Sequence, residues 1–219
     1  NYNTVSVSGD TRFDRVSNQL DTNNSVLFIE QFKANKLCIV IGSSWPDDDK
    51  LYIDYINRSS NEGIKFIIAP HNIKPSYIAS LKTQLKLKTT CYTEMQNQDV
   101  SNCDVFILDT IGYLSKVYSY ADIAFVGGAS GSNGLHNILE PAVFGIPILI
   151  GKNYEKFPEA KALIDLGGLV SVSCPEAFEV ILNKLSKDNS LRKKQGLINA
   201  NYIKKNRGAV IQILNHIRI

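Results

Sequence analysis

The sequence predicts an α/β fold, a doubly wound parallel sheet with helices on both faces. Of the 219 residues, 44% are hydrophobic, and 24 Lys+Arg nearly balance 21 Asp+Glu. This composition indicates a globular core and excludes a disordered tail or a strongly basic nucleic-acid-binding arm. Short apolar runs alternate with amphipathic stretches of helical length, as in βαβ units. The runs are almost continuously apolar, which is typical of strands that helices cover on both faces.

Seven runs of strand length are rich in β-branched residues. In chain order they are residues 5–8, 37–41, 64–69, 105–108, 123–126, 146–150 and 169–172. Amphipathic stretches between them predict helices at residues 50–57, 75–85, 114–121 and 157–166. From Pro175 onward only helical patterns remain. Residues 176–219 are therefore expected to form a helical tail, with breaks at Asp188 and near Gly208.

The chain contains neither an internal repeat nor a low-complexity linker, so residues 1–219 are expected to form one domain. No apolar run approaches the roughly 20 residues that span a bilayer, and the first residues lack a secretory-signal pattern. We therefore expect a soluble chain. Four cysteines without C-x-x-C spacing and only three histidines predict reduced thiols and no metal site.

In a doubly wound sheet, ligands bind where strands end and loops lead into helices. The first predicted strand leads through Gly9 to Arg12, whose guanidinium suits a phosphate or a carboxylate. Alternatively, Asp10 caps the next helix while Arg12 pairs with Asp14 on the surface.

The second predicted strand leads into Gly42-Ser43-Ser44, where backbone N–H groups and two hydroxyls could cradle an anion. The acidic residues 47–49 follow directly and would repel an anion placed at that helix start. Ser44 could equally be an N-cap, with Pro46 at the first helical position. Both interpretations can hold together, because Ser43 precedes the cap.

Two further loops carry candidate ligand-binding residues. Pro70 forces an extended exit from the third predicted strand and places His71 at the sheet edge, although a lone histidine is more often structural. After residues 105–108, the backbone amides of Ile111 and Gly112 could read the edge of a flat base, or they could belong to a capped turn.

The strongest local signal is the glycine-rich segment 127–134, which includes Gly128 and has four glycines in eight residues. It leads into a helix start that carries His136 and Asn137, a place where anions bind readily. Glu140 could cap this helix or accept hydrogen bonds from two ribose hydroxyls. The segment is neither a P-loop nor a G-x-G-x-x-G dinucleotide motif.

Taken together, segments 9–15, 42–44, 69–71, 109–112 and 127–151 resemble one family. That family is the 3-deoxy-D-manno-octulosonic acid (Kdo) transferases, which are GT-B glycosyltransferases of lipopolysaccharide synthesis. The resemblance spans about residues 5–162. The family has two Rossmann-like domains, and this chain looks like the C-terminal, donor-binding one, with the N-terminal acceptor domain absent.

The resemblance implies transfer of Kdo from CMP-Kdo to a lipid A precursor, without a metal or another cofactor. The family's catalytic carboxylate belongs to the N-terminal domain, so no catalytic residue is assigned here. The resemblance also implies roles for single residues. Glu140 would bind ribose, and Ile111 and Gly112 would present backbone to cytosine. The residues implied for the phosphate and the Kdo carboxylate are Arg12, Ser43, Ser44, His71, Gly128, His136 and Asn137. Asn72 and Tyr113 stand where the family usually has acidic residues, which puts donor specificity in question.

The tail is basic although the whole chain is nearly neutral. Its basic residues between positions 184 and 207, opposed only by Asp188, are Lys184, Lys187, Arg192, Lys193, Lys194, Lys204, Lys205 and Arg207. They could rest on anionic lipid headgroups, or they could form an ordinary solvated face. The full-length protein would then work at the cytoplasmic face of the bacterial inner membrane. Nucleic acid is not an expected partner. Two alternatives remain, a GT-B domain that uses a UDP-sugar and a non-catalytic nucleotide-binding module.

Overall fold

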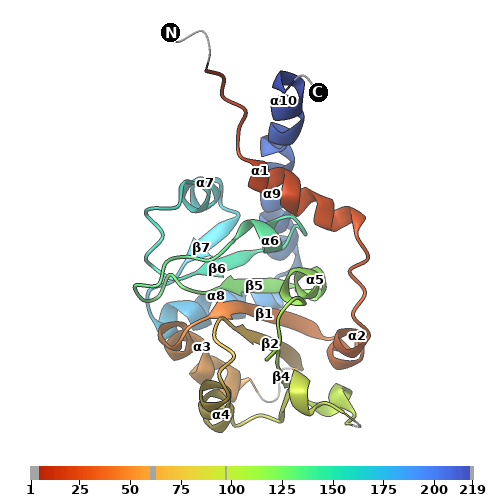
Figure 1. The fold of residues 1–219 in the computed structure, drawn as a ribbon. Coiled ribbons are helices and arrows are strands. Elements are labelled where there is room, and N and C mark those ends of the chain that lie inside the picture. The colour runs from red at the N-terminus through yellow and green to blue at the C-terminus, as the bar shows by residue number, and fades with distance from the viewer. Residues whose placement is uncertain (1–4, 60–62, 97, 218–219) are drawn as a thin grey trace.

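The computed structural model describes residues 5–59, 63–96 and 98–217, and seven parallel strands form its sheet (Figure 1). The strand order is β3-β4-β2-β1-β5-β6-β7, so the direction of winding reverses between β1 and β5. This confirms the predicted fold class. The strands are β1 (Leu37–Ser44), β2 (Ile64–Pro70), β3 (Thr89–Cys91), β4 (Val105–Ile107), β5 (Ile123–Val126), β6 (Ile148–Ile150) and β7 (Leu169–Ser171).

Helices cover both faces of the sheet. The α-helices are α1 (Thr11–Ser17), α2 (Leu27–Lys33), α3 (Pro46–Arg58), α4 (Pro75–Gln84), α5 (Leu114–Val117), α6 (Leu139–Ala142), α7 (Pro158–Leu166), α8 (Pro175–Lys187), α9 (Asn189–Asn206) and α10 (Ala209–His216). The short 3-10 helices are η2 (Asn18–Asp21), η3 (Tyr92–Glu94), η4 (Val100–Asn102) and η5 (Tyr118–Tyr120). Helices α3, α4, α7 and α8 each begin with proline, which the first helical position tolerates because its N–H has no partner within the helix.

Two apolar clusters lie on opposite faces of the sheet. Because successive strand side chains alternate, Ile39 and Ile41 of β1 pack with α3, α4 and α8, whereas Cys38 and Val40 pack with α1, α2, α5, α6, α7 and α9. These β1 side chains are fully buried. Burying an isoleucine contributes about 1.5–3 kcal/mol relative to leaving it exposed. The two clusters therefore fix the sheet between its helices.

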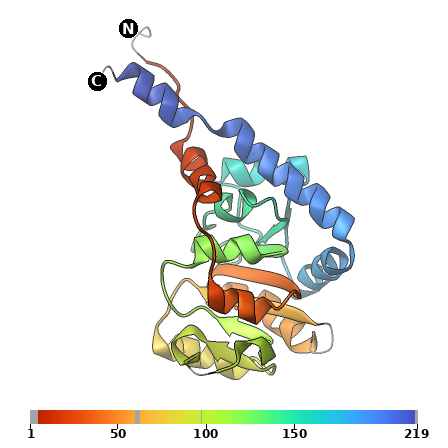
Figure 2. The same ribbon diagram turned by 90° about the vertical axis from the view of Figure 1, so that its right-hand side faces the viewer.

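The first predicted strand is wrong. Residues 5–8 form no strand, and Val5 and Val7 are 78% and 92% exposed. The segment runs alongside α10, where no strand is available to pair with it (Figure 2). The first strand in the chain is β1. Strand β3 was missed, because three residues at the sheet edge, two of them threonines, give no apolar run.

The helical tail forms as predicted, with helices α8, α9 and α10. Its first break occurs at Asp188, which accepts a hydrogen bond from the Leu191 N–H at 2.9 Å and so caps α9. The second occurs at Gly208, which has a left-handed backbone with φ of 116°. The backbone N–H groups of Gly208 and Val210 donate to the carboxylate of Asp14 on α1. Helix α1 therefore anchors the start of α10. In the described part of the chain, no helix is both long and apolar enough to cross a membrane.

Candidate functional site at the sheet switch point

The carboxyl ends of β1 and β5 meet at the point where the strand order reverses, which is the usual ligand-binding position in such sheets. The Gly127 N–H donates to the Gly42 carbonyl at 2.9 Å and continues the pairing of these strands into the loops. A Cβ at Gly127 would lie 2.5 Å from the Ser43 carbonyl oxygen and 2.7 Å from Asp48 Oδ2. Only glycine therefore lets the two loops approach so closely.

Asp48 ties the glycine-rich loop to the start of α3. Its carboxylate is fully buried, and Oδ2 accepts hydrogen bonds from the N–H of Trp45 at 2.9 Å and of Gly128 at 2.8 Å. The Gly128 N–H is thus used within the protein and is not presented to a ligand. Asp48 also points inward, so the acidic residues 47–49 do not form one repulsive surface towards an incoming anion.

The two serines after β1 have different environments. Ser43 has a left-handed backbone, with φ of 54°, at a register shift in the pairing of β1 with β2. Ser44 is fully buried, and its hydroxyl accepts a hydrogen bond from Tyr52 at 3.3 Å, so it does not face a ligand as predicted. The alternative interpretation, in which Ser44 is the N-cap, is also wrong, because Trp45 holds that position, although Pro46 is the first helical residue as that interpretation has it.

Three rings from three loops stack at this edge of the sheet. Trp45 follows β1, His71 follows β2, and His136 lies in the loop after β5. The His71 ring centroid is 4.5 Å from that of Trp45 and 4.5 Å from that of His136. The Trp45 Nε1–H donates to His136 Nε2 at 2.9 Å. Burial lowers the pKa of His136, and the neighbouring His71 lowers it further while the Asp48 charge opposes the shift. The structure thus brings both predicted histidines together.

A pocket of about 420 Å³ brings together Ile111 and Gly112, from the loop before α5, and Glu140, from α6. Its remaining lining residues are Arg15, Val16, Gln19, Leu114, Ser115 and Val143. Burial raises the pKa of Glu140, while a hydrogen bond from Asn137 and the charge of Arg15 oppose that shift. A half-buried carboxylate in a pocket with both apolar and polar lining residues is suited to accept hydrogen bonds from hydroxyl groups.

Asn137 orients Glu140. Its Nδ2 donates to Glu140 Oε1 at 3.1 Å, and its Oδ1 accepts from the Leu139 N–H at 3.1 Å. The side chain therefore closes the turn that leads into α6, and Glu140 lies in the first turn of that helix. Asn137 acts on the pocket through the carboxylate that it holds.

Arg15 and Gln19 line the pocket but were not assigned as site residues from the sequence. They stand four residues apart near the buried Phe13 and Val16 of α1. Arg15 lies in α1 and Gln19 in the 3-10 helix η2 that follows it, and a spacing of four residues, which places side chains on one side of a helix, was a usable signal in the sequence. This spacing was overlooked because residues 9–15 were interpreted as the loop after a strand at residues 5–8.

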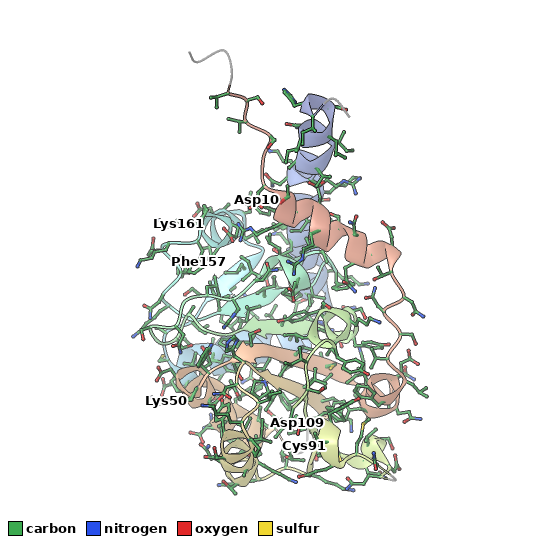
Figure 3. The ribbon with its side chains drawn as sticks, viewed as in Figure 1. Asp10, Lys50, Cys91, Asp109, Phe157 and Lys161 are labelled. Carbon is green, nitrogen blue, oxygen red and sulfur yellow. The ribbon has the colours of Figure 1, made fainter. Side chains whose placement is uncertain are left out.

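Arg12 does not lie at the end of a strand, contrary to the prediction. It belongs to α1, which Asp10 caps by accepting the Arg12 N–H at 2.8 Å. The guanidinium bonds to Asp10 and to Glu159 of α7, not to Asp14. The hydrogen bond that Arg12 donates to Asp10 raises the pKa of Arg12, the bond to Glu159 raises it further, and burial opposes both effects. Figure 3 shows Asp10 at the start of α1, away from Lys50 on α3. Arg12 therefore joins α1 to α7.

The four cysteines are free thiols, and burial raises the pKa of Cys38 to about 12 and that of Cys91 to about 11. Thiols with such pKa values are not nucleophiles near neutral pH. Among the residues that the structure describes, no group of three or more His, Cys, Asp or Glu side chains could hold a metal ion.

Comparison with known proteins identifies relatives among the 3-deoxy-D-manno-octulosonic acid transferases. The Haemophilus influenzae protein is 32% identical over 146 residues, which are 66% of this chain and 33% of the relative. The Rickettsia prowazekii protein is 27% identical over 183 residues, which are 78% of this chain and 40% of the relative. The chain thus spans between a third and two-fifths of the length of these two relatives. No protein-family model matches it.

Solved structures share the fold. The C-terminal CMP-Kdo binding domain of WaaA from Acinetobacter baumannii has a TM-score of 0.67 at 20% identity, covering 90% of this chain and 100% of that chain. HepE from Anabaena in complex with UDP-glucose has a TM-score of 0.62 at 14% identity, covering 88% of this chain and 53% of that one. The chain is therefore related in sequence to the Kdo transferases over part of their length, and its fold is that of a GT-B Rossmann-like domain.

Proposed function

We propose that this chain is the donor-binding domain of a glycosyltransferase that transfers Kdo from CMP-Kdo to a lipid A precursor in lipopolysaccharide synthesis. The observation that carries the proposal is the pocket in which Glu140 and the Ile111-Gly112 backbone come together. His136 directly precedes Asn137, whose side chain donates to Glu140. The relationship to Kdo transferases selects CMP-Kdo as the donor.

The nucleoside occupies the pocket. Its volume of about 420 Å³ lies in the range of small-molecule sites. Glu140 accepts hydrogen bonds from the ribose hydroxyls, and Asn137 keeps its carboxylate in place. Gly112 has a left-handed backbone with φ of 95°, and no atom lies within 4 Å of the place where its Cβ would be. The backbone at Ile111 and Gly112 is therefore open to the edge of a base.

The phosphate and the carboxylate of CMP-Kdo face hydrogen-bond donors from several structural elements. His71 directly follows β2, His136 lies in the loop after β5, and Arg15 of α1 lines the pocket. A phosphate and a sugar carboxylate are both stabilised by such groups in a partly desolvated cleft. Ser43 remains a candidate for binding these anionic groups only because it lies in the loop after Gly42.

The chemistry of transfer needs groups outside the described residues. We assign no catalytic base here and propose that an N-terminal domain supplies it together with the binding site for the lipid A precursor. No metal or other cofactor is part of the proposal. The proposed location of the complete protein is the cytoplasmic face of the inner membrane, where the basic tail would face anionic lipid.

Calorimetry with CMP tests the donor assignment. Glu140→Gln keeps the shape of the side chain but removes its charge, and it should weaken CMP binding at least about tenfold, since a hydrogen bond to a charged group contributes about 1.5–3 kcal/mol. Glu155→Gln is the matched control, because that carboxylate is 70% exposed and pairs with Lys161 outside the pocket.

UDP in the same titration separates the candidate donors. Tighter binding of UDP than of CMP would indicate that the donor is a UDP-sugar and not CMP-Kdo. The fold shared with HepE, whose structure contains UDP-glucose, supports this alternative. Indifference of the unmodified chain to both nucleotides at millimolar concentration would contradict the proposal. Equal affinities of Glu140→Gln and the unmodified chain would favour a binding module in which Glu140 only caps α6.

A further inference from the structure

The contact between the only tryptophan of the chain and His136 has a chemical consequence. An indole N–H can only donate, so His136 Nε2, which lies 2.9 Å from Trp45 Nε1, must carry a lone pair. A neutral imidazole bears its proton on the other nitrogen. His136 is therefore held with Nδ1–H as its free donor. Protonation at Nε2 would oppose two N–H groups and break the hydrogen bond.

The backbone directs Trp45 to this position. The register shift at Ser43, where β1 departs from regular pairing with β2, turns the chain just before the tryptophan. Such irregularities commonly re-aim a side chain beside a functional site. Trp45 then has an extended backbone as the N-cap of α3, and its N–H is fixed by Asp48. The ring is thus held at both its backbone and its indole nitrogen.

His136 is equally constrained. Its backbone N–H donates to the Gly127 carbonyl at 3.1 Å, and a Cβ on Gly128 would lie 3.0 Å from its Cδ2 atom. One edge of the ring therefore faces the glycine-rich loop and Nε2 faces Trp45. Among the described residues, no side chain or backbone group pairs with Nδ1. That N–H is available to a ligand at the switch point.

We propose that Trp45 is a positioning residue that fixes His136 as a neutral Nδ1–H donor, so that the site recognises an anionic phosphate through a hydrogen bond from His136 instead of through its charge. Because the phosphate is that of the nucleotide assigned above, the identity of the ligand rests on the proposed function. The tautomer assigned to His136 does not depend on the proposed function, because it follows from the contact with Trp45. The charged or titratable groups that face His136 are His71, stacked on it, and Asp48.

Stacking explains why a neutral donor is favourable here. His71 and His136 lie with centroids 4.5 Å apart, so two imidazolium charges would repel each other strongly at this distance. With His136 held neutral, this repulsion does not arise.

Nitrogen NMR of the free protein tests the tautomer directly. The chain has only three histidines, so His71→Gln and His216→Gln variants assign the signals without ambiguity. We expect His136 in the Nδ1–H form. We also expect the signal of the single indole N–H to be shifted from the position of a solvent-exposed indole, because this N–H donates to His136. In Trp45→Phe, which keeps a stacking ring but has no N–H, His136 should move towards the Nε2–H form. Finding His136 as Nε2–H in the unmodified chain, or unchanged in Trp45→Phe, overturns the inference.

Nucleotide binding gives a second readout that a purely structural role would not move. Trp45→Phe should bind CMP about fivefold to tenfold more weakly at pH 8, which corresponds to the loss of one oriented hydrogen bond. Its affinity should recover as the pH falls to 6, because the freed His136 can then become charged. An identical pH profile in Trp45→Phe and the unmodified chain contradicts the inference.

Substitution of His136 separates a neutral donor from a charge. Glutamine can accept from the Trp45 indole and donate to a phosphate, so His136→Gln should stay within about threefold of the unmodified affinity for CMP, while His136→Ala should lose about tenfold. Equal losses in the two variants would show that charge is what matters and would overturn the inference. If the unmodified chain does not bind CMP at all, the proposed function fails, and the NMR result alone decides the role of Trp45.

Discussion

Asp47, Asp48 and Asp49 follow one another in the sequence, yet each has a different environment. Asp47 forms an exposed ion pair with Lys50, Asp48 is buried beneath the glycine-rich loop, and Asp49 is buried between two tyrosines. Burial raises the pKa of Asp49, against the hydrogen bonds from Tyr52 and Tyr77. Consecutive residues of a helix point about 100° apart, so the three neighbouring aspartates contact three different parts of the structure.

The raised pKa of Asp49 predicts a dependence of stability on pH. A carboxyl whose pKa is higher in the folded state than in the unfolded state favours folding while it is protonated. The stability that it contributes is present below the ordinary carboxyl pKa and is lost as the pH rises through the raised value. Asp49→Asn should therefore reduce the loss of unfolding free energy between pH 4 and pH 7.5, as measured by urea denaturation.

Asp54→Asn provides the control for this prediction, because Asp54 lies on the same helix and is exposed. Its pH profile should match that of the unmodified chain. An Asp49→Asn profile parallel to both would show that Asp49 is not the group responsible.

At the scale of elements, α9 determines how the tail packs on the domain. It contacts α1, α6, α7 and α8, and its buried Asn199 donates to the carbonyls of Ile146 and Gly168. Gly196 lies against the turn that precedes β6, where an added Cβ would be 1.9 Å from the Gly145 carbonyl oxygen. The helix approaches this turn so closely because it has no side chain there.

Gly196→Ala should therefore destabilise the protein, although alanine is favoured over glycine in a helix interior by about 1 kcal/mol. The clash is with backbone, so α9 must move, and a loss of about 1–3 kcal/mol is expected from such overpacking. Chemical denaturation measures the change. Asn201→Ala, at an exposed position of the same helix, should be neutral or slightly stabilising. A gain of stability in Gly196→Ala would contradict the packing described here.

At the scale of the whole molecule, the tail presents both charge and apolar surface. Lys193, Lys194, Lys204 and Lys205 are exposed on α9, and α10 leaves Ile211 and Leu214 more than half exposed. Arg192, in contrast, donates to the carbonyls of Leu185 and Ser186 and joins α8 to α9. Helix α10 also extends beyond the sheet (Figure 2). A basic, partly apolar projection suits the surface of an anionic membrane.

Sedimentation with lipid vesicles tests this contact. Each basic residue near an anionic surface contributes about 1 kcal/mol, so changing the four lysines of α9 to glutamine should weaken binding to vesicles rich in phosphatidylglycerol by about two orders of magnitude or more. Neutral phosphatidylcholine vesicles should bind neither protein. Equal binding of the unmodified and substituted chains to anionic vesicles would show that this face is only solvated.

Apolar periodicity in the sequence predicts β1, β2, β4, β5, β6 and β7, because buried parallel strands leave nearly continuous apolar runs. Residue type predicts the two breaks of the tail, because Asp188 can cap a helix with its side chain and Gly208 can adopt a left-handed backbone. Residues 5–8 show the limit of this reasoning, because a strand exists only where a neighbour can pair with it. The same limit explains the misplacement of Arg12, whose predicted position depended on that strand.

Residue patterns alone predicted the α/β fold, the segments that carry His71, Ile111, Gly112 and Glu140, and the relationship to Kdo transferases. These are properties of local periodicity and of residue types in ordered motifs. The tertiary structure decided which side chains meet: Arg15 takes a place at the pocket, Ser44 is buried, and Trp45 reaches His136. Such pairings depend on the strand order and on the turn at Ser43, because they join atoms from segments far apart in the chain.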